Sequence, residues 1–214
     1  RHCVRAYNGS VVGPTIETPA RADAPRSVRV DLLNRLSGHD YQSLEGGSCT
    51  CTTSSGASCV PAHVHSACLA DDHGHDHDPC LCVDDEGDAC EHMFDFNVTN
   101  LHAHGSHVRP DFARGGEACA DETVDGVRLR CRDCDNVACD GTTADDTCFH
   151  GDNVLNAVHP GEGARYRWDI DEDGTHHEGL QWYHPHIHGT TAMQVASGAA
   201  GAWLVRGPVD SLPG

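Results

Sequence analysis

The sequence predicts an all-β fold, a Greek-key β-sandwich that carries two long cysteine-rich loop insertions. Short segments of alternating apolar and polar residues recur with turn residues between them, which is typical of an antiparallel sandwich. Hydrophobic residues make up 38% of the 214-residue chain and aromatic residues only 5%. A modest sheet core must therefore support much irregular surface. We expect one domain over residues 1–214.

Alternating hydrophobicity predicts the strands. Residues 27–36 alternate apolar and polar side chains in their first half, as a half-buried strand should. In residues 93–101, Phe94, Phe96 and Val98 alternate with polar residues, so we expect the apolar set to share one face. Further predictions are strands at 165–170, 179–183 and 202–206, and a short helix at 191–197 that ends at Gly198.

Two insertions separate these elements, at about residues 38–92 and about 113–150. The first loses all periodicity and fills with Gly, Ser, Cys, His and Asp, which cannot supply a regular core. The second is predicted to be a loop stapled by cysteines. We expect no internal repeat in the chain.

Thirteen cysteines indicate an oxidising compartment, so the protein is predicted to be periplasmic or secreted. Disulfides are the favoured interpretation, although Cys131, Cys134, Cys139 and Cys148 can in principle bind zinc. The pairs Cys49/Cys51 and Cys80/Cys82 are too close for an internal bridge, so each cysteine should bond outward. Since thirteen is odd, one thiol is free or pairs with a partner chain.

The charge balance excludes nucleic acid as a partner. Fourteen basic residues face 33 acidic ones, for a formal net charge of −19, and a phosphate backbone needs clustered cations instead. The sequence has no run of about eighteen apolar residues, so no transmembrane segment is predicted.

Two histidine pairs are the candidate metal ligands: His102 and His104, and then His184 and His186 about eighty residues later. Side chains of an extended strand alternate between faces, so the members of each pair point the same way, with Cα atoms about 6.5–7 Å apart. That spacing suits two neighbouring metal ions better than one. Imidazole binds copper, zinc, iron and nickel, so these residues alone leave the metal open.

Four sequence blocks surround these pairs: Tyr7-Asn8-Gly9-Ser10 through Ile16, Thr99-Asn100-Leu101-His102 through Pro110, Asp152-Asn153-Val154 with Pro160-Gly161-Glu162, and Gln181-Trp182-Tyr183-His184 through Ala202. In order and spacing they resemble the first, N-terminal cupredoxin domain of the laccase-like multicopper oxidases. The resemblance covers about half of the chain, and the two insertions make up most of the rest.

The resemblance implies a copper cofactor, namely half of the ligands of a trinuclear type 2 and type 3 cluster. His102 matches a type 2 ligand, His104 and His184 match ligands that share one type 3 copper, and His186 matches a ligand of the other. His107 and His188 follow the same face pattern but match no ligand of the family. We expect them to support the ligands or to lie at the surface.

The same resemblance implies an incomplete enzyme. In the family the other cluster histidines, and a type 1 copper site with its His-Cys-His block, lie in a C-terminal cupredoxin domain, and this sequence has no such block. We expect the chain alone to be inactive. With such a domain, from the same parent chain or a second polypeptide, it would couple one-electron oxidation of a substrate to reduction of dioxygen to water. The oligomeric state stays open.

Other interpretations remain. The chain can be a non-catalytic copper-binding or structural cupredoxin module in an exported assembly. A zinc hydrolase is a weaker alternative, because no His-Glu-x-x-His pattern occurs. The histidine- and aspartate-rich stretch at 63–78 can either load copper or form an acidic loop with incidental affinity for divalent ions.

Overall fold

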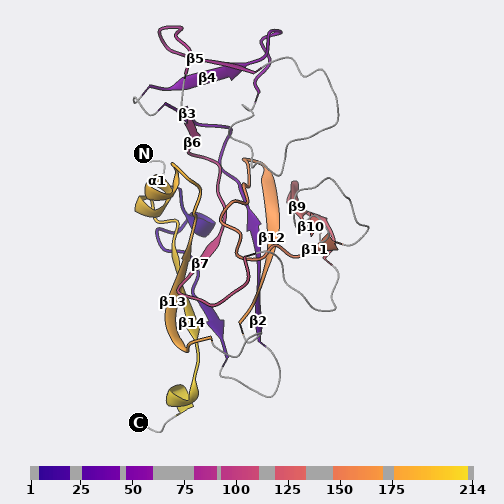
Figure 1. Cartoon of the computed structure of the whole chain (residues 1–214), viewed down its shortest axis with the longest axis vertical. Helices are drawn as coiled ribbons and strands as arrows, with labels where there is room; N and C mark the ends of the chain where they lie inside the picture. Colours follow the sequence, from indigo (N-terminus) through magenta and orange to yellow (C-terminus); the bar gives the residue numbers. More distant parts are fainter. Residues whose placement is uncertain are drawn as a thin grey trace.

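The structure, a computed structural model, describes residues 5–19, 26–43, 47–59, 80–90, 93–110, 119–133, 147–170 and 176–211. Two four-stranded sheets form its body (Figure 1). The first has the order β1 (Ile16–Thr18), β14 (Gly201–Val205), β13 (Gly179–His184), β7 (His102–His104). The second has the order β2 (Ser27–Leu33), β12 (Glu162–Asp169), β9 (Val127–Arg130), β8 (Glu122–Val124).

The core lies between these two sheets, which confirms the predicted all-β sandwich. Trp168 of β12 and Trp203 of β14 stack with ring centroids 5.4 Å apart, and neither is more than 1% exposed. Tyr166, Ile170 and Leu101 are buried in the same cluster. Two of the pairings, β1–β14 and β9–β12, are parallel, so the sheets are mixed rather than purely antiparallel.

The remaining predicted elements of the sandwich form close to their expected bounds. The single α-helix among the described residues, α1, spans Thr191–Ala196, and two 3-10 turns lie at η1 (Tyr7–Gly9) and η4 (Pro208–Ser211). No helix in the described ranges has the length and apolar character needed to cross a membrane.

β2 ends earlier than predicted because the buried amide of Asn34 donates to the carbonyls of Asn97 (2.6 Å) and Val158 (2.9 Å).

The prediction of one strand over residues 93–101, with its apolar side chains on one face, is wrong. Only β6 (Phe94–Asp95) is a strand, and the polar Asp95, Asn97 and Thr99 are buried, whereas Phe94 and Phe96 are partly exposed. Side-chain hydrogen bonds explain this inversion. The Asp95 carboxylate accepts the N–H groups of Asp40 and Asn97, and such local bonds compete with a strand ladder.

The first insertion has a core of its own, contrary to expectation. β3 (Tyr41–Gln42) pairs with β6, and β4 (Cys49–Thr52) pairs with β5 (Leu81–Asp84). The disulfides are Cys49–Cys90, Cys51–Cys82 and Cys59–Cys80, so these cysteines bond outward as predicted. They pack with Tyr41 and Met93, and we call residues 47–59 and 80–90 the cysteine module. Figure 1 shows it beyond one end of the sandwich.

The cysteine module also contains an internal repeat, so the expectation of none is wrong. Residues 49–59 and 80–90 share the pattern C-x-C-x4-G-x2-C, offset by the 31 residues that separate Cys51 from Cys82. Gly56 and Gly87 both have positive φ, +82° and +89°, at equivalent turns. When the two repeats are exchanged, the disulfide Cys51–Cys82 corresponds to itself, and Cys49–Cys90 corresponds to Cys59–Cys80. The module therefore has a two-fold pattern of bonds.

The second insertion contributes strands to the sandwich rather than only a stapled loop. The hairpin of β8 and β9 joins the second sheet beside β12, and Cys119–Cys131 closes the base of the hairpin. β10 (Arg132–Asp133) pairs with β11 (Thr147–Cys148). Because Cys131 is in a disulfide, it is removed from the alternative zinc set, whose members Cys134 and Cys139 lie outside the described residues.

A substitution at Gly201 is a test of the packing of the first sheet. A Cβ on Gly201 would overlap the ring of Tyr183, its cross-strand partner, whereas a Cβ on Gly47 would meet nothing closer than Ser43 Oγ at 3.6 Å. We expect Gly201→Ala to lower the free energy of unfolding by about 1–3 kcal/mol. Gly47→Ala should change it by less than about 1 kcal/mol. Denaturant unfolding measures both, and equal effects would contradict the packing.

The disulfide pattern is tested by counting thiols. The double variant Cys49→Ser/Cys90→Ser removes both ends of one bridge and should add no free thiol to the parent count. The mismatched variant Cys49→Ser/Cys82→Ser breaks two bridges and should add two thiols, those of Cys90 and Cys51. Titration of the denatured, unreduced protein gives the count, and the reverse result would refute the pairing.

Candidate metal centre

The pairing of β7 with β13 brings the predicted histidines together. In this antiparallel register His102 lies opposite His184, and His104 lies opposite Trp182. Since side chains alternate along a strand, all four of these residues share one face of the first sheet. His186 follows two residues after β13 ends.

The four imidazole rings form one cluster. The ring centroid of His102 lies 5.8 Å from that of His104, 5.4 Å from that of His184 and 4.9 Å from that of His186. The ring of His184 lies 5.8 Å from the rings of both His104 and His186. Imidazoles this close and on one face are a set of nitrogen donors suited to copper or zinc.

His184 is the buried member of the cluster. Its Nδ1–H donates to the carbonyl of Pro185 (2.7 Å), and its Nε2 is buried with no hydrogen-bond partner in the part of the chain that the structure describes. A buried nitrogen lone pair without a donor is what a metal ion can satisfy. Burial lowers the pKa of His184, and the neighbouring histidines lower it further, so the ring stays neutral and able to bind a cation.

A carboxylate holds His102 in position. Asp152 Oδ2 lies 2.9 Å from His102 Nδ1, and Asp152 Oδ1 accepts the N–H of Ala103 (2.8 Å). This contact places the ring proton on Nδ1 and leaves Nε2 free to bind a metal. Local sequence patterns do not connect Asp152 with His102, because the two residues lie about fifty positions apart and only the fold brings them together.

Asn100 and Gln194 fix the segments on either side of the cluster, and the sequence analysis assigned neither a role. The fully buried Asn100 accepts the N–H of His186 at 2.5 Å and donates to the carbonyl of Val154 at 2.8 Å. Gln194 of α1 donates to the carbonyl of Val98 (2.6 Å) and accepts from the hydroxyl of Thr99 (2.9 Å). The helix is thereby tied to the chain that leads into β7.

The other candidate residues lie apart from the cluster. His107 and His188 are exposed. The ring of His107 contacts the rings of His176 and His177, and the ring of His188 contacts that of Phe94. The histidine-rich stretch at 63–78 lies outside the described residues.

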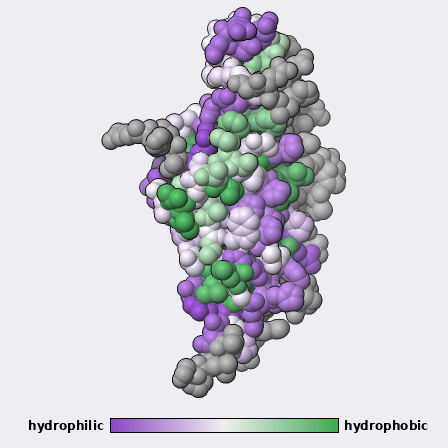
Figure 2. All heavy atoms as spheres, turned by 90° about the vertical axis from the view of Figure 1, so that its left-hand side faces the viewer, coloured by the Kyte–Doolittle hydropathy of each residue, from purple (hydrophilic) through white to green (hydrophobic). Residues whose placement is uncertain are grey.

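The histidine cluster opens onto a partly apolar surface. His104 and His186 are exposed, and on β13 Leu180 is 76% exposed and Trp182 39%. The Trp182 ring stacks on His184 with centroids 4.2 Å apart. Figure 2 shows apolar patches on the side of the molecule that carries β13, β14 and α1. Exposed apolar residues beside a polar site mark a surface that another protein segment can cover.

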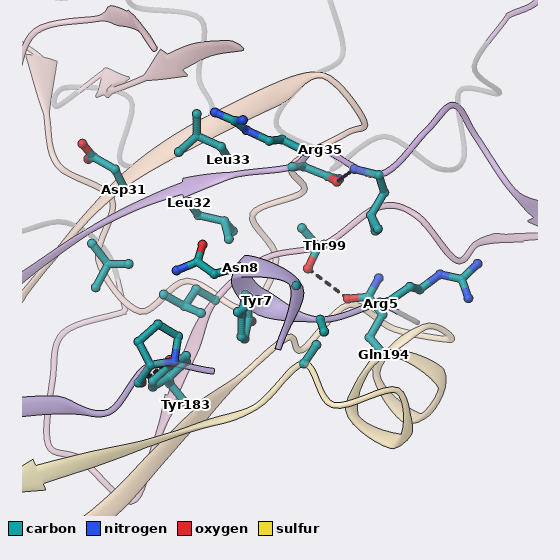
Figure 3. A pocket seen from close by; sticks show the side chains of 18 of the residues that line it. Arg5, Tyr7, Asn8, Asp31, Leu32, Leu33, Arg35, Thr99, Tyr183 and Gln194 are labelled. Atoms are coloured by element: carbon teal, nitrogen blue, oxygen red, sulfur yellow. Dashed lines mark hydrogen bonds between the residues drawn. The ribbon is translucent and has the colours of Figure 1, made fainter. Parts of the chain in front are cut away.

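A separate cavity of about 780 Å³ lies between the two sheets (Figure 3). Its lining includes Tyr7, Leu32, Leu101 and Tyr183, and the hydrogen bond between Thr99 and Gln194 lies at its edge. Burial raises the pKa of Tyr183 to about 12, so its hydroxyl stays protonated at neutral pH. None of the four clustered histidines lines this cavity, so the histidine face is the candidate site.

Residues 140–210 match the family described as Multicopper oxidase. A solved structure, a multicopper oxidase from Campylobacter jejuni described as a metallo-oxidase, aligns with 95% of this chain at 19% identity and a TM-score of 0.41. The alignment covers 21% of that protein, so this chain spans about a fifth of its length. No curated protein sequence matches the chain. The matched residues include β12, the second histidine pair, α1 and β14, so this part of the chain is similar to the multicopper oxidase family.

Proposed function

We propose that this chain is the N-terminal domain of a copper-dependent oxidase and that it supplies half of the ligands of a trinuclear copper cluster. The observation that carries this proposal is the register of β7 and β13, which sets His102 opposite His184 and gathers His104 and His186 beside them. Four imidazoles on one open face fit copper, because copper accepts nitrogen donors and here leaves positions for further ligands.

The roles of the four histidines follow the family resemblance. His102 serves the type 2 copper, His104 and His184 share one type 3 copper, and His186 binds the other. Copper, when bound, would supply one-electron redox chemistry and the reduction of dioxygen to water. The chain's own groups hold the ligands: Asp152 fixes the tautomer of His102, and the Pro185 carbonyl fixes that of His184.

A second cupredoxin domain completes the site in this proposal. It belongs to the same parent chain or to another polypeptide, covers the face with Leu180 and Trp182, and brings the remaining histidines and the type 1 copper. Disulfides in both insertions support export to the periplasm or the exterior, where such bonds persist. The electron donor binds near the type 1 copper in the family, so it is set by the other domain.

A second candidate is a non-catalytic copper-binding module of an exported assembly. The cysteine module favours it, because a disulfide-linked unit projects from one end of the sandwich and offers an attachment surface (Figure 1). The two candidates differ in whether a domain with a type 1 copper accompanies this chain.

Asp152 tests the copper ligation. In Asp152→Asn the side-chain amide would donate to His102 Nδ1, which moves the ring proton to Nε2 and blocks that ligand atom. We expect copper affinity to fall about 10- to 100-fold. Competition titration with a copper chelator measures it on parent and variant, and any other copper site contributes equally to both.

The matched control is Asp125→Asn, which removes an exposed carboxylate whose partner is the exposed Arg35. It should leave copper affinity unchanged. If Asp152→Asn and Asp125→Asn behave alike, the His102 contact does not support a copper ligand.

The copper content of natively purified material decides between the two candidates. We expect a trinuclear cluster and a type 1 copper for each copy of this chain, together with a second cupredoxin polypeptide or a longer parent chain. Intact mass, measured with and without reduction, reveals that partner. One copper ion or fewer on a lone chain of 214 residues would eliminate the oxidase and leave the binding module.

A further inference from the structure

We propose that His39, Asp95 and His159 form a second metal site, distinct from the histidine cluster and specific for a first-row divalent cation such as Zn²⁺. One ligand atom from each residue lies within 4.8 Å of the other two, and among the described residues this is the one group of three or more that combines histidine and carboxylate ligands at that distance. His39 Nδ1 contacts Asp95 Oδ2, and the rings of His39 and His159 meet edge to face at 5.8 Å.

Three separate parts of the chain build this group. His39 precedes β3 and Asp95 lies in β6. These two paired strands carry the cysteine module, and we call them the stem. His159 lies just before β12 of the sandwich. None of these residues belongs to the proposed copper ligands, so the inference does not depend on the proposed function.

The carboxylate is held by the backbone and directed at the histidines. Asp95 Oδ1 accepts the N–H groups of Asp40 (3.0 Å) and Asn97 (2.9 Å), which leaves Oδ2 for His39. The Asp95 side chain is fully buried, and His159 is only 7% exposed. The ring of His39 stacks on Tyr41 at 5.2 Å, which restricts its rotation. Asp95 and His39 are thus held in place before any ion binds.

A cation would add positive charge to a buried carboxylate that has two backbone N–H donors and the ring of His39 as partners. An ionised carboxylate in a protein interior is costly unless a positive charge or several donors compensate it. A divalent ion bound by two imidazoles and one carboxylate supplies that charge, and this ligand set is one that Zn²⁺ accepts, with a water in the fourth position. The ion would join the stem of the cysteine module to the sandwich, because its ligands come from both.

The alternative is a purely structural group, in which His39 and Asp95 form a hydrogen-bonded pair beside His159. The two accounts differ in the number of metal ions bound. A shared ion requires that removing any one ligand abolish the same binding event, whereas a hydrogen-bonded group makes no difference to metal stoichiometry.

The experiment is a calorimetric titration of the metal-free, disulfide-intact chain with Zn²⁺. The variants are Asp95→Asn, His159→Gln and the two combined, with Asp125→Asn, an exposed carboxylate that pairs with Arg35, as matched control. We expect each single variant to lose one equivalent, the double variant to lose the same one and no more, and the control to lose none. Zinc bound elsewhere on the chain cancels in these differences.

Equal stoichiometry in the parent and all variants would overturn the proposal. Near-UV circular dichroism and thiol content of the metal-free variants verify their folding. Should Asp95→Asn or His159→Gln fail to fold, His39→Asn, at a partly exposed ligand, repeats the comparison. Anomalous diffraction at the zinc edge from zinc-soaked crystals of the parent gives an independent result. A peak among the three residues supports the site, and zinc found only elsewhere refutes it.

Discussion

The candidate site depends on the antiparallel pairing of β7 with β13. The side-chain period of a strand is two, so a slip of one residue would send the histidines of β7 to the interior and Ala103 to the surface. Tyr183 prevents such a slip, because its ring fills the space above Gly201 on β14 and its hydroxyl donates to the carbonyl of Pro14. The position of the metal ligands is therefore set by the packing on the opposite face of the same strand.

Buried polar side chains connect this sheet to its surroundings. Asn34, Asn97 and Gln194 each use an amide to bind backbone carbonyls of other segments, and Asp95 uses its carboxylate to bind backbone N–H groups. Such groups are stable in an interior only when their hydrogen bonds are made, so they specify one arrangement of the segments. The stem of the first insertion is attached to the sandwich mainly in this way, and the cysteine module then folds on disulfides rather than on apolar side chains.

Local patterns predicted much of the sandwich and the candidate site. β2, β12, β13, β14 and α1 form within a few residues of their predicted bounds, since alternation and turn signals act over short distances. Alternation failed at residues 94–98, where hydrogen bonds of Asp95 and Asn97 outweighed hydropathy. The repeat of the cysteine module lies in the spacing of cysteine and glycine and includes no hydrophobic period, so alternation gives no sign of it.

By itself the sequence determined the class of fold, the two histidine pairs and the alternation that puts each pair on one face, because these properties depend on neighbours along the chain. Only the tertiary structure decided that the two pairs meet, that Asp152 orients His102, and that His39, Asp95 and His159 converge. Those contacts join residues that are fifty or more positions apart. Strand register and the packing of buried groups determine them, and neither is encoded in any single segment.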